Sequence, residues 1–297
     1  MLLVIGICIA FCAMLSFEVF MLPGLSSTSL LPAADAAAPA ASGQALKTAV
    51  AALAVFGVNG VDADGAGGPP RSLAPPNITV IMPCFGQVAY LEEGLRSILS
   101  QQYPAAEIIV VDDGSEDRCG EAAKRLLDGP LAALRRQNIR TLQSWWGWGD
   151  ADLSRFRDEI VRTPNRGVAH ARNTGIRRAR GDWICCMDAD DTVSATYFLQ
   201  AMSHVAKEPG TNLVYANQQF FGESKWQWHV PELRADFALV NGPLPLMTLW
   251  RKALWHATPH GFDEALPRGH EDWAFWLQLM RLSLHPHHIE DFQVQYR

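Results

Sequence analysis

The sequence predicts an α/β domain with a mostly parallel central sheet flanked by helices, over residues 78–297 of a 297-residue chain. Two observations lead to this prediction. Short apolar runs with strand character alternate along the chain with segments of helical periodicity, an order typical of parallel sheets. The runs end in Pro, Gly and carboxylate residues, where strands meet loops. We expect a single such domain, preceded by an apolar helix and a disordered linker.

The first elements of this domain alternate between strand and helix. The runs ITVIMP (78–83) and EIIVVDDGS (107–115) are predicted to be buried strands. Apolar residues at helical spacing predict helices over Tyr90–Gln102 and Glu121–Leu134. Strands joined by such helices are parallel, with right-handed crossovers.

Polar residues gather where these strands end. In open parallel sheets, ligands bind beyond the carboxyl ends of the strands, so Pro83–Phe85 and Asp112–Ser115 should face one crevice. A third apolar run, GDWICCMDADD (181–191), closes on Asp188, Asp190 and Asp191. Carboxylates this close repel one another unless a cation or hydrogen-bond donors compensate. Their hard oxygen atoms suit Mg²⁺ or Mn²⁺ bound together with substrate phosphates, and the alternative is a solvated acidic turn.

The N-terminal part has a different character. Residues 1–22 are apolar apart from two polar positions, and their length is close to what a membrane-spanning helix needs. We expect a membrane anchor (a signal-anchor) or a cleaved signal peptide there. Residues 23–77 are rich in Ala, Pro, Gly and Ser, a composition that predicts a mostly disordered linker.

Composition excludes some classes of protein. The net charge is −6 and basic residues occur singly or in pairs, so no surface for nucleic acid is expected. The six cysteines show no zinc-site spacing, and we expect neither a zinc site nor a disulfide framework. The cysteines of the domain are instead predicted to be small buried residues.

Four motifs in order resemble those of the inverting glycosyltransferases of family 2, which have the GT-A fold. They are VIMPCFG, LRSILSQQYPAAEIIVVDDGSED, NRGVAHARNTGIRRARGDWICCMDADD and GHEDWAFWLQL. The resemblance covers roughly residues 78–297. It implies an enzyme of hexosyl- or N-acetylhexosaminyl-transferase type, which moves a sugar from a nucleotide diphosphate donor, with UDP expected. The acceptor would be a hydroxyl of a glycan, lipid or protein.

The resemblance also implies roles on the donor side. Asp113 would hydrogen-bond the nucleotide base, although Asp112 could instead be the structural member that caps the turn. Asp190 would bind Mn²⁺ or Mg²⁺ on the diphosphate, where the ion neutralises charge on the leaving group. Asp191 would cap the following segment. The remaining nucleotide-binding positions would be Pro83, Phe85, Gly167, Asn173 and Asp188, with Asp188 near the ribose and Gly167 and Asn173 supporting the pocket.

On the acceptor side, the resemblance implies that Asp272 is the catalytic base. It would take the proton of the acceptor hydroxyl as the new bond forms, and Glu271 would position it or touch the acceptor. The structural alternative is an acidic pair stabilised at a helix N-terminus, and both roles can hold at once. Trp273 and Trp276 are expected to be core residues rather than sugar platforms.

An unusual stretch over about residues 137–159 departs from the family pattern. Its tryptophans at positions 145, 146 and 148 could bind a glycan or a membrane, or pack as a loop on the domain. The Q-x-x-R-W signature of processive polymerases is absent, which favours transfer of single sugars.

The sequence bears on three alternative functions. A sugar-nucleotide pyrophosphorylase would need a Gly-rich triphosphate loop, and none is found. A Rossmann dehydrogenase would need G-x-G-x-x-G after the first strand, where this chain reads PCFGQV. A non-catalytic nucleotide-sugar-binding module remains open, because sequence alone does not show turnover.

The protein is expected to be a single-pass membrane protein of the secretory pathway or Golgi. The alternatives are secretion after signal cleavage, or a tethered domain in the cytosol. The last is favoured by the absence of basic residues before the apolar run and by Lys47 and Arg71 after it.

Overall fold

A computed structural model describes residues 77–148, 156–239, 242–266 and 269–297. The chain divides into two units, Met1–Gly67 and Gly68–Arg297, and all described residues belong to the second. The predicted anchor over residues 1–22 and nearly all of the predicted linker lie outside the described residues. Among the described residues, no helix is both long enough and apolar enough to cross a bilayer.

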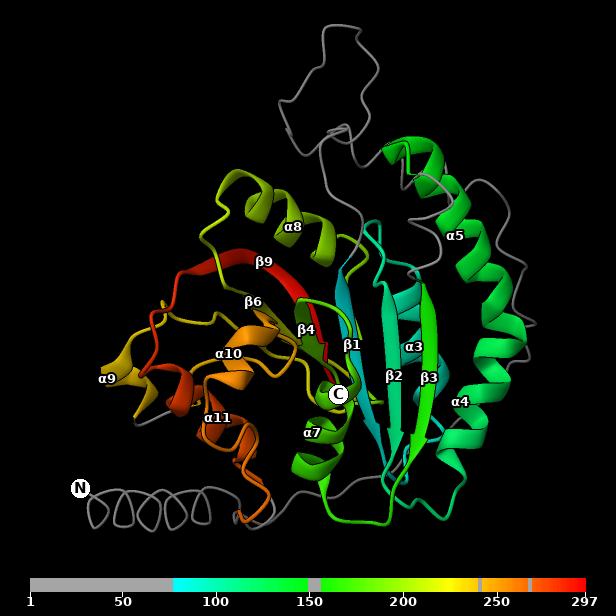
Figure 1. The fold of residues 1–297 in the computed structure, drawn as a ribbon, viewed down its shortest axis with the longest axis horizontal. Coiled ribbons are helices and arrows are strands. Elements are labelled where there is room, and N and C mark those ends of the chain that lie inside the picture. The colour runs from blue at the N-terminus through cyan, green and yellow to red at the C-terminus, as the bar shows by residue number, and fades with distance from the viewer. Residues whose placement is uncertain (1–76, 149–155, 240–241, 267–268) are drawn as a thin grey trace, which may run out of the picture. The chain divides into compact units, whose positions relative to one another are not determined.

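The described strands form one mixed sheet (Figure 1). Its order is β3-β2-β1-β4-β8-β6-β9-β5, with β7 paired to β6. The first four strands in this order are mutually parallel, as predicted, whereas β8 runs antiparallel to both of its neighbours. The strands are β1 (Ile78–Cys84), β2 (Glu107–Asp112), β3 (Arg157–Arg162), β4 (Trp183–Cys186), β5 (Thr192–Val193), β6 (Leu213–Phe220), β7 (Gln227–Trp228), β8 (Leu249–Arg251) and β9 (Pro286–Tyr296).

Helices cover both faces of the sheet. One hydrophobic core packs α3, α4, α5 and α8 against one face, and a second packs α7, α10 and α11 against the other. Alternate residues of β1 enter the two cores: Val80 and Met82 the first, Ile81 the second. This confirms the predicted sheet flanked by helices. The helices are α3 (Leu91–Leu99), α4 (Cys119–Asp128), α5 (Pro130–Trp146), α7 (Val168–Arg178), α8 (Tyr197–Lys207), α9 (Ala235–Ala238), α10 (Lys252–His256) and α11 (Glu271–Leu279).

One expectation for the middle of the domain is wrong. The helix predicted over Glu121–Leu134 is broken into α4 and α5 at Gly129, because Pro130 can begin a helix but cannot continue one. Of the unusual stretch over residues 137–159, the structure describes 137–148 and 156–159. Its first ten residues complete α5, and its last three begin β3.

Trp148 is a core residue rather than a platform for glycan or membrane. Its side chain is 6% exposed and meets the ring of Tyr103 edge-on, with the ring centroids 6.1 Å apart. The expectation that this part of the chain packs on the domain is therefore confirmed for Trp148.

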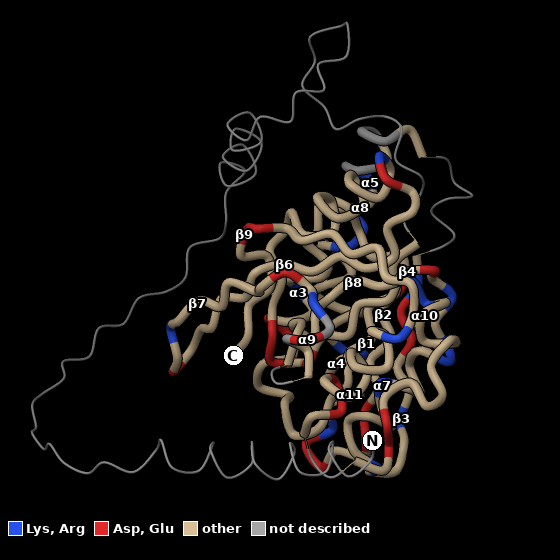
Figure 2. The backbone as a smooth tube through the Cα atoms, turned by 90° about the vertical axis from the view of Figure 1, so that its left-hand side faces the viewer, with Lys and Arg blue, Asp and Glu red and all other residues tan. Residues whose placement is uncertain are grey.

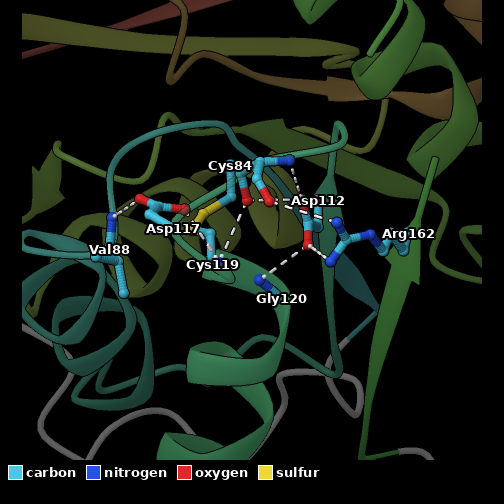
Figure 3. Close-up of a disulfide and its surroundings, with 8 residues drawn as sticks. Cys84, Val88, Asp112, Asp117, Cys119, Gly120 and Arg162 are labelled. Carbon is cyan, nitrogen blue, oxygen red and sulfur yellow. Dashed lines mark hydrogen bonds and ion pairs between the residues drawn. A yellow bond between two sulfur atoms is a disulfide. The ribbon is translucent and has the colours of Figure 1, made fainter. Parts of the chain in front are cut away.

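The expectation of no disulfide is also wrong. Cys84, at the end of β1, is bonded to Cys119, at the start of α4, with their Cα atoms 6.2 Å apart (Figure 3). The two residues are 35 apart in sequence, so only the folded sheet brings them together. Cys185 and Cys186 are buried thiols, as predicted, and burial raises the pKa of both.

Reduction of this disulfide is expected to lower the free energy of unfolding by about 4 kcal/mol, because the bond closes a loop of this length in the unfolded chain. The measurement is the urea midpoint with and without dithiothreitol. The double variant Cys84→Ala/Cys119→Ala is the control, and its midpoint should not respond to the reductant. A wild-type midpoint that is equally insensitive would mean that the bond does not form.

Candidate active site

The ends of three parallel strands bring the predicted donor-side residues together. Cys84 lies opposite Asp112 in the register of β1 and β2, and Ile81 lies opposite Cys186 of β4. The residues that follow these strands therefore leave one edge of the sheet, as expected from the sequence. Phe85 is 52% exposed there, whereas Pro83 is part of buried β1.

Asp112 shapes the turn after β2. One carboxylate oxygen accepts hydrogen bonds from the backbone N (2.8 Å) and the Oγ (2.7 Å) of Ser115. The other accepts from Gly120 N at 3.3 Å and from Arg162 Nη1 at 3.4 Å (Figure 3). The carboxylate is thus fully engaged by its own loop and by α4, as the structural alternative expected.

Asp113 holds the loop that joins β3 to α7. Its carboxylate accepts hydrogen bonds from Gly167 N at 2.8 Å, from Arg166 N at 3.1 and 3.3 Å, and from Thr163 Oγ1 at 3.1 Å. Gly167 has φ +93°, a conformation that favours glycine and that turns the chain into α7. Each carboxylate oxygen thus accepts two hydrogen bonds, one of them from Arg166 N, which is shared between the two oxygens.

Asn173 supports the site rather than lining it. Its amide donates to Phe262 O (2.7 Å) and Glu264 Oε1 (3.1 Å). Its oxygen accepts from Trp255 Nε1 (3.1 Å) and Phe262 N (3.0 Å). These are all four hydrogen bonds that an amide side chain forms, so none is left for a nucleotide. Asn173 was predicted to bind or support the nucleotide pocket, and its contacts give it the supporting role.

Glu264 belongs to the same supporting network and was not predicted from sequence. Its carboxylate contacts His170 Nδ1 at 2.9 Å and Arg166 Nη2 at 3.1 Å, besides Asn173. Burial would raise the pKa of Glu264, but the hydrogen bonds from Asn173 and His170 outweigh it and lower the pKa. Glu264 lies in the loop that follows α10, and its contacts with His170 and Asn173 join that loop to α7. No motif marks it in the sequence.

Arg172 is the residue that connects the two halves of the site, and it too was not singled out from the sequence. Its side chain is only 3% exposed. Nη2 contacts both oxygens of Asp188, at 2.9 and 3.2 Å, and Nη1 donates to Glu271 Oε1. The guanidinium also lies over the ring of Phe262, 5.4 Å from its centroid.

The charges around Arg172 favour its ionised form. Burial lowers the pKa of Arg172, but Asp188 and Glu271 outweigh burial and raise the pKa above its ordinary value. Asp188 lies 16 residues from Arg172 in sequence, and Glu271 lies 99 away. A single buried cation therefore joins the predicted donor-side carboxylate to the predicted acceptor-side pair. The signal in the sequence that could have identified Arg172 is its place in the A-R-N-x-G motif.

Asp190 and Asp191 follow β4 on the same edge. Burial raises the pKa of both carboxyls, and the charge of Asp188 raises it further, to about 8 for Asp191. Asp191 was predicted to cap the following segment, but the structure shows a different contact. Its Oδ1 instead accepts a hydrogen bond from Arg297 N at 3.0 Å, because β9 returns the far end of the chain to this loop. Arg297 Nε donates to the backbone oxygen of Asp190, at 3.0 Å.

Asp272 lies in the first turn of α11, next to Glu271. Burial raises the pKa of Asp272, and the charge of Glu271 raises it too, whereas Arg172 opposes both. Oδ1 accepts a hydrogen bond from Trp273 N at 2.7 Å. On the same helix Trp276 is fully buried, which confirms the core prediction for it, whereas Trp273 is half-buried.

Tyr296 is within electrostatic reach of carboxylates from both halves of the site. Burial raises the pKa of its hydroxyl, and so do four neighbouring negative charges, those of Asp191, Asp188, Asp190 and Asp272. Asp272, from α11, therefore lies near the acidic loop that follows β4. The arrangement pairs a carboxylate that can act as a base with carboxylates that can hold a cation.

The donor set fits a divalent cation held mainly by a substrate. Within the described ranges, no three His, Cys, Asp or Glu side chains converge as a complete metal site. Mg²⁺ and Mn²⁺ commonly use one or two carboxylates plus substrate phosphates, so a complete protein site is not required. Asp190 offers one such carboxylate. It is half-buried, lies in the field of Asp188 and accepts a hydrogen bond from the side chain of Gln87, while Arg297 Nε donates to its backbone oxygen.

Comparisons with known proteins agree with this geometry. The sequence model of the family described as "Glycosyl transferase family 2" matches residues 79–262. The uncharacterised glycosyltransferase EpsJ of Bacillus subtilis is 28% identical over 212 residues, which are 70% of this chain and 49% of that protein. An uncharacterised glycosyltransferase of Haemophilus influenzae is 32% identical over 120 residues, 40% of this chain and 38% of that protein. The chain thus spans half or less of the length of these curated relatives.

A solved structure has the same fold. The crystal structure of Staphylococcus aureus TarS, residues 1–349, superposes with a TM-score of 0.54 at 18% sequence identity. The match covers 74% of this chain and 60% of that one. TarS 1–349 has also been solved in complex with UDP and with UDP-GlcNAc. At this level of identity, the likeness establishes the GT-A type of fold.

Proposed function

The chain belongs to glycosyl transferase family 2, and we propose that it transfers a single sugar from a nucleotide diphosphate donor, UDP-linked, to an acceptor hydroxyl, with inversion. The observation that carries this proposal is the bridge made by Arg172. It holds Asp188, on the donor side, and Glu271, beside the proposed base, at one site. A nucleotide-binding sheet alone would not need this connection.

The donor would lie across the carboxyl ends of β1, β2 and β4. Asp113 would accept an N–H of the base in place of the longer of its two contacts with Arg166 N, at 3.3 Å, and exposed Phe85 can flank the ring. Gly167 keeps the adjoining loop in place through its hydrogen bond to Asp113. The complexes of the similarly folded TarS with UDP and UDP-GlcNAc support a uracil nucleotide and a hexosamine-type donor.

Asp190 would hold Mn²⁺ or Mg²⁺ on the donor diphosphate. The ion, when bound, would neutralise negative charge that develops on the leaving diphosphate. In this chain, Asp190 is held in place by the contact of Arg297 with its backbone oxygen, and Asp188 is held by Arg172. A cation would bind the Asp190 carboxylate beside its hydrogen bond from Gln87, whereas the charge of Asp188 is already compensated by Arg172.

Asp272 would be the base. Its Oδ1 is held by the backbone of α11, which leaves Oδ2 to receive the proton of the acceptor hydroxyl. The helix N-terminus and Arg172 favour the ionised form of Asp272, which a base requires. Burial raises the pKa of Asp272 and so makes the carboxylate more basic. Glu271, bound to Arg172, fixes the first turn of α11 and with it the direction of Asp272.

We also propose that residues 1–22 anchor the chain in a membrane of the secretory pathway, with the domain on the non-cytosolic side. The disulfide between Cys84 and Cys119 supports this side, because such bonds persist in oxidising compartments and are rare in the cytosol. Secretion after cleavage of the N-terminal segment would satisfy the same condition.

A donor and acceptor screen tests the proposed activity. The full chain would be incubated with Mn²⁺ and, separately, UDP-GlcNAc, UDP-glucose and GDP-mannose, together with a panel of saccharide acceptors. Product formation would be measured by mass spectrometry, and the anomeric configuration by NMR. A β-linked product from an α-linked donor is expected. Donor binding without any product from the panel would favour a non-catalytic binding module, and a retained configuration would exclude the single displacement.

Asp190→Asn is expected to weaken Mn²⁺-dependent UDP binding about tenfold or more, because the amide is a poor ligand for a hard cation. Calorimetric titration with UDP, with and without Mn²⁺, measures this effect. Asp128→Asn, an exposed change on α4, is the matched control and should leave binding unchanged. Equal Mn²⁺ dependence in wild type and Asp190→Asn would remove Asp190 from the metal site.

A further inference from the structure

The hairpin formed by β6 and β7 carries exposed aromatic side chains. Trp226 stacks on Phe220 with centroids 4.0 Å apart and planes 12° apart, and Phe220 contacts the ring of Tyr296 at 5.3 Å. Trp226 is 52% exposed and Tyr296 41%. We call Trp226, Phe220 and Tyr296 the aromatic strip. The backbone fixes their order, since Phe220 lies opposite Tyr296 in the sheet and its N donates to Trp226 O at 2.9 Å.

The aromatic strip begins at the candidate active site. The hydroxyl of Tyr296 lies in the field of the four carboxylates, including Asp272. The next residue, Arg297, is hydrogen-bonded to the loop of Asp190 and Asp191, and its guanidinium lies between the rings of Tyr90 and Phe221, 4.6 and 4.3 Å from their centroids. From Tyr296 the strip leads outward along the hairpin, which projects from the domain in Figure 2.

We propose that the aromatic strip is a subsite for a saccharide acceptor, in which a sugar ring away from the reacting hydroxyl stacks on Trp226. This inference rests on the proposed sugar transfer and adds the class of acceptor. One face of Trp226 is covered by Phe220, so its exposure belongs to the other face and to the ring edges. A pyranose ring presents C–H groups on its face and hydroxyl groups at its rim. Its face can therefore pack on a flat aromatic ring whose edges are exposed to solvent.

The size of the strip favours a saccharide over a protein partner. An aromatic side chain buries about 150–250 Å² when it is fully covered, and only parts of these rings are accessible. A stable protein interface uses about 800 Å² from each partner, which is more than the strip can supply. The turn beside it, moreover, exposes the charged residues Glu223 and Lys225, which an apolar contact would have to desolvate. A glycan chain needs only one or two such rings.

Saccharide binding to the full chain tests this inference. Wild type, saturated with UDP and Mn²⁺, would be titrated with chitotetraose, cellotetraose and maltotetraose, using calorimetry and saturation-transfer NMR. At least one tetrasaccharide is expected to bind. Trp226→Ala should weaken that binding about tenfold, whereas Trp226→Phe should largely retain it, because the flat face is kept. Lys225→Ala, on the adjacent turn, is the matched control. None of the three changes should alter UDP affinity.

The outcomes separate this inference from the proposed function. Wild type that binds UDP but none of the tetrasaccharides, or Trp226→Ala that binds them as tightly as wild type, would overturn the acceptor subsite and leave the donor site standing. Failure of wild type to bind UDP would count against the proposed function itself. If Trp226→Ala instead converts an oligomer into a monomer without changing saccharide affinity, the strip is an interface between copies of the chain, and the inference is wrong.

Discussion

Replacing Asp272 with Asn is expected to reduce sugar transfer by about 10²-fold or more, while UDP affinity stays within experimental error. The amide keeps the shape of the carboxylate and can still accept a hydrogen bond from Trp273 N. It has no basicity with which to take the acceptor proton. Transfer would be measured as the initial rate of UDP release with a saturating donor.

The pH dependence of the rate gives a second readout. The base must be ionised, so the wild-type rate should rise with pH through the pKa of Asp272, which burial places above its ordinary value. This limb should disappear in Asp272→Asn. Asp263→Asn is the matched control, because this half-buried carboxylate also accepts a backbone hydrogen bond, from Ala265 N at 2.9 Å. Wild-type rates in Asp272→Asn would remove Asp272 from the chemistry.

Replacing Arg172 with Met is expected to lower the free energy of unfolding by about 3–5 kcal/mol at pH 7.5, because it leaves Asp188 and Glu271 facing each other without their shared cation. Methionine is similar in length, so the loss of charge is the main change. Urea denaturation at pH 7.5 measures the loss.

Arg96→Met is the matched control for Arg172→Met. Arg96 contacts Glu92 on the surface of α3, and both side chains are more than half exposed. Exposed pairs of this kind contribute at most about 1 kcal/mol, so the control should lower the free energy of unfolding only slightly. A similarly small effect for both variants would mean that the Arg172 bridge does not hold the site together.

The strands and the donor-side loops could be predicted because their signals are local. An apolar run that ends in carboxylates identifies β2 and β4 without information from distant parts of the chain. The parallel sheet then brings those ends to one edge, and this places Asp113 and Asp188 near each other without further information. The motif resemblance added Asp190 and Asp272, and their chemical roles remain predictions.

The contacts that join the halves of the site could not be predicted, because they depend on distant segments. Arg172 reaches Glu271 across 99 residues, and Asp191 accepts a hydrogen bond from Arg297 across 106. The disulfide from Cys84 to Cys119 was missed for the same reason, since it needs the positions of both β1 and α4. The break before Pro130 was different. Its signal was local, but the helical periodicity on either side outweighed it in our prediction.

A crystal structure of the full chain with UDP and Mn²⁺ would test the central claim most directly. The account predicts the uracil between Asp113 and Phe85, and an anomalous manganese peak beside Asp190 with the diphosphate as its other ligand. It also predicts that the open oxygen of Asp272 faces the donor from the acceptor side. A nucleotide bound away from the ends of β1, β2 and β4, or a manganese ion remote from Asp190, would contradict it.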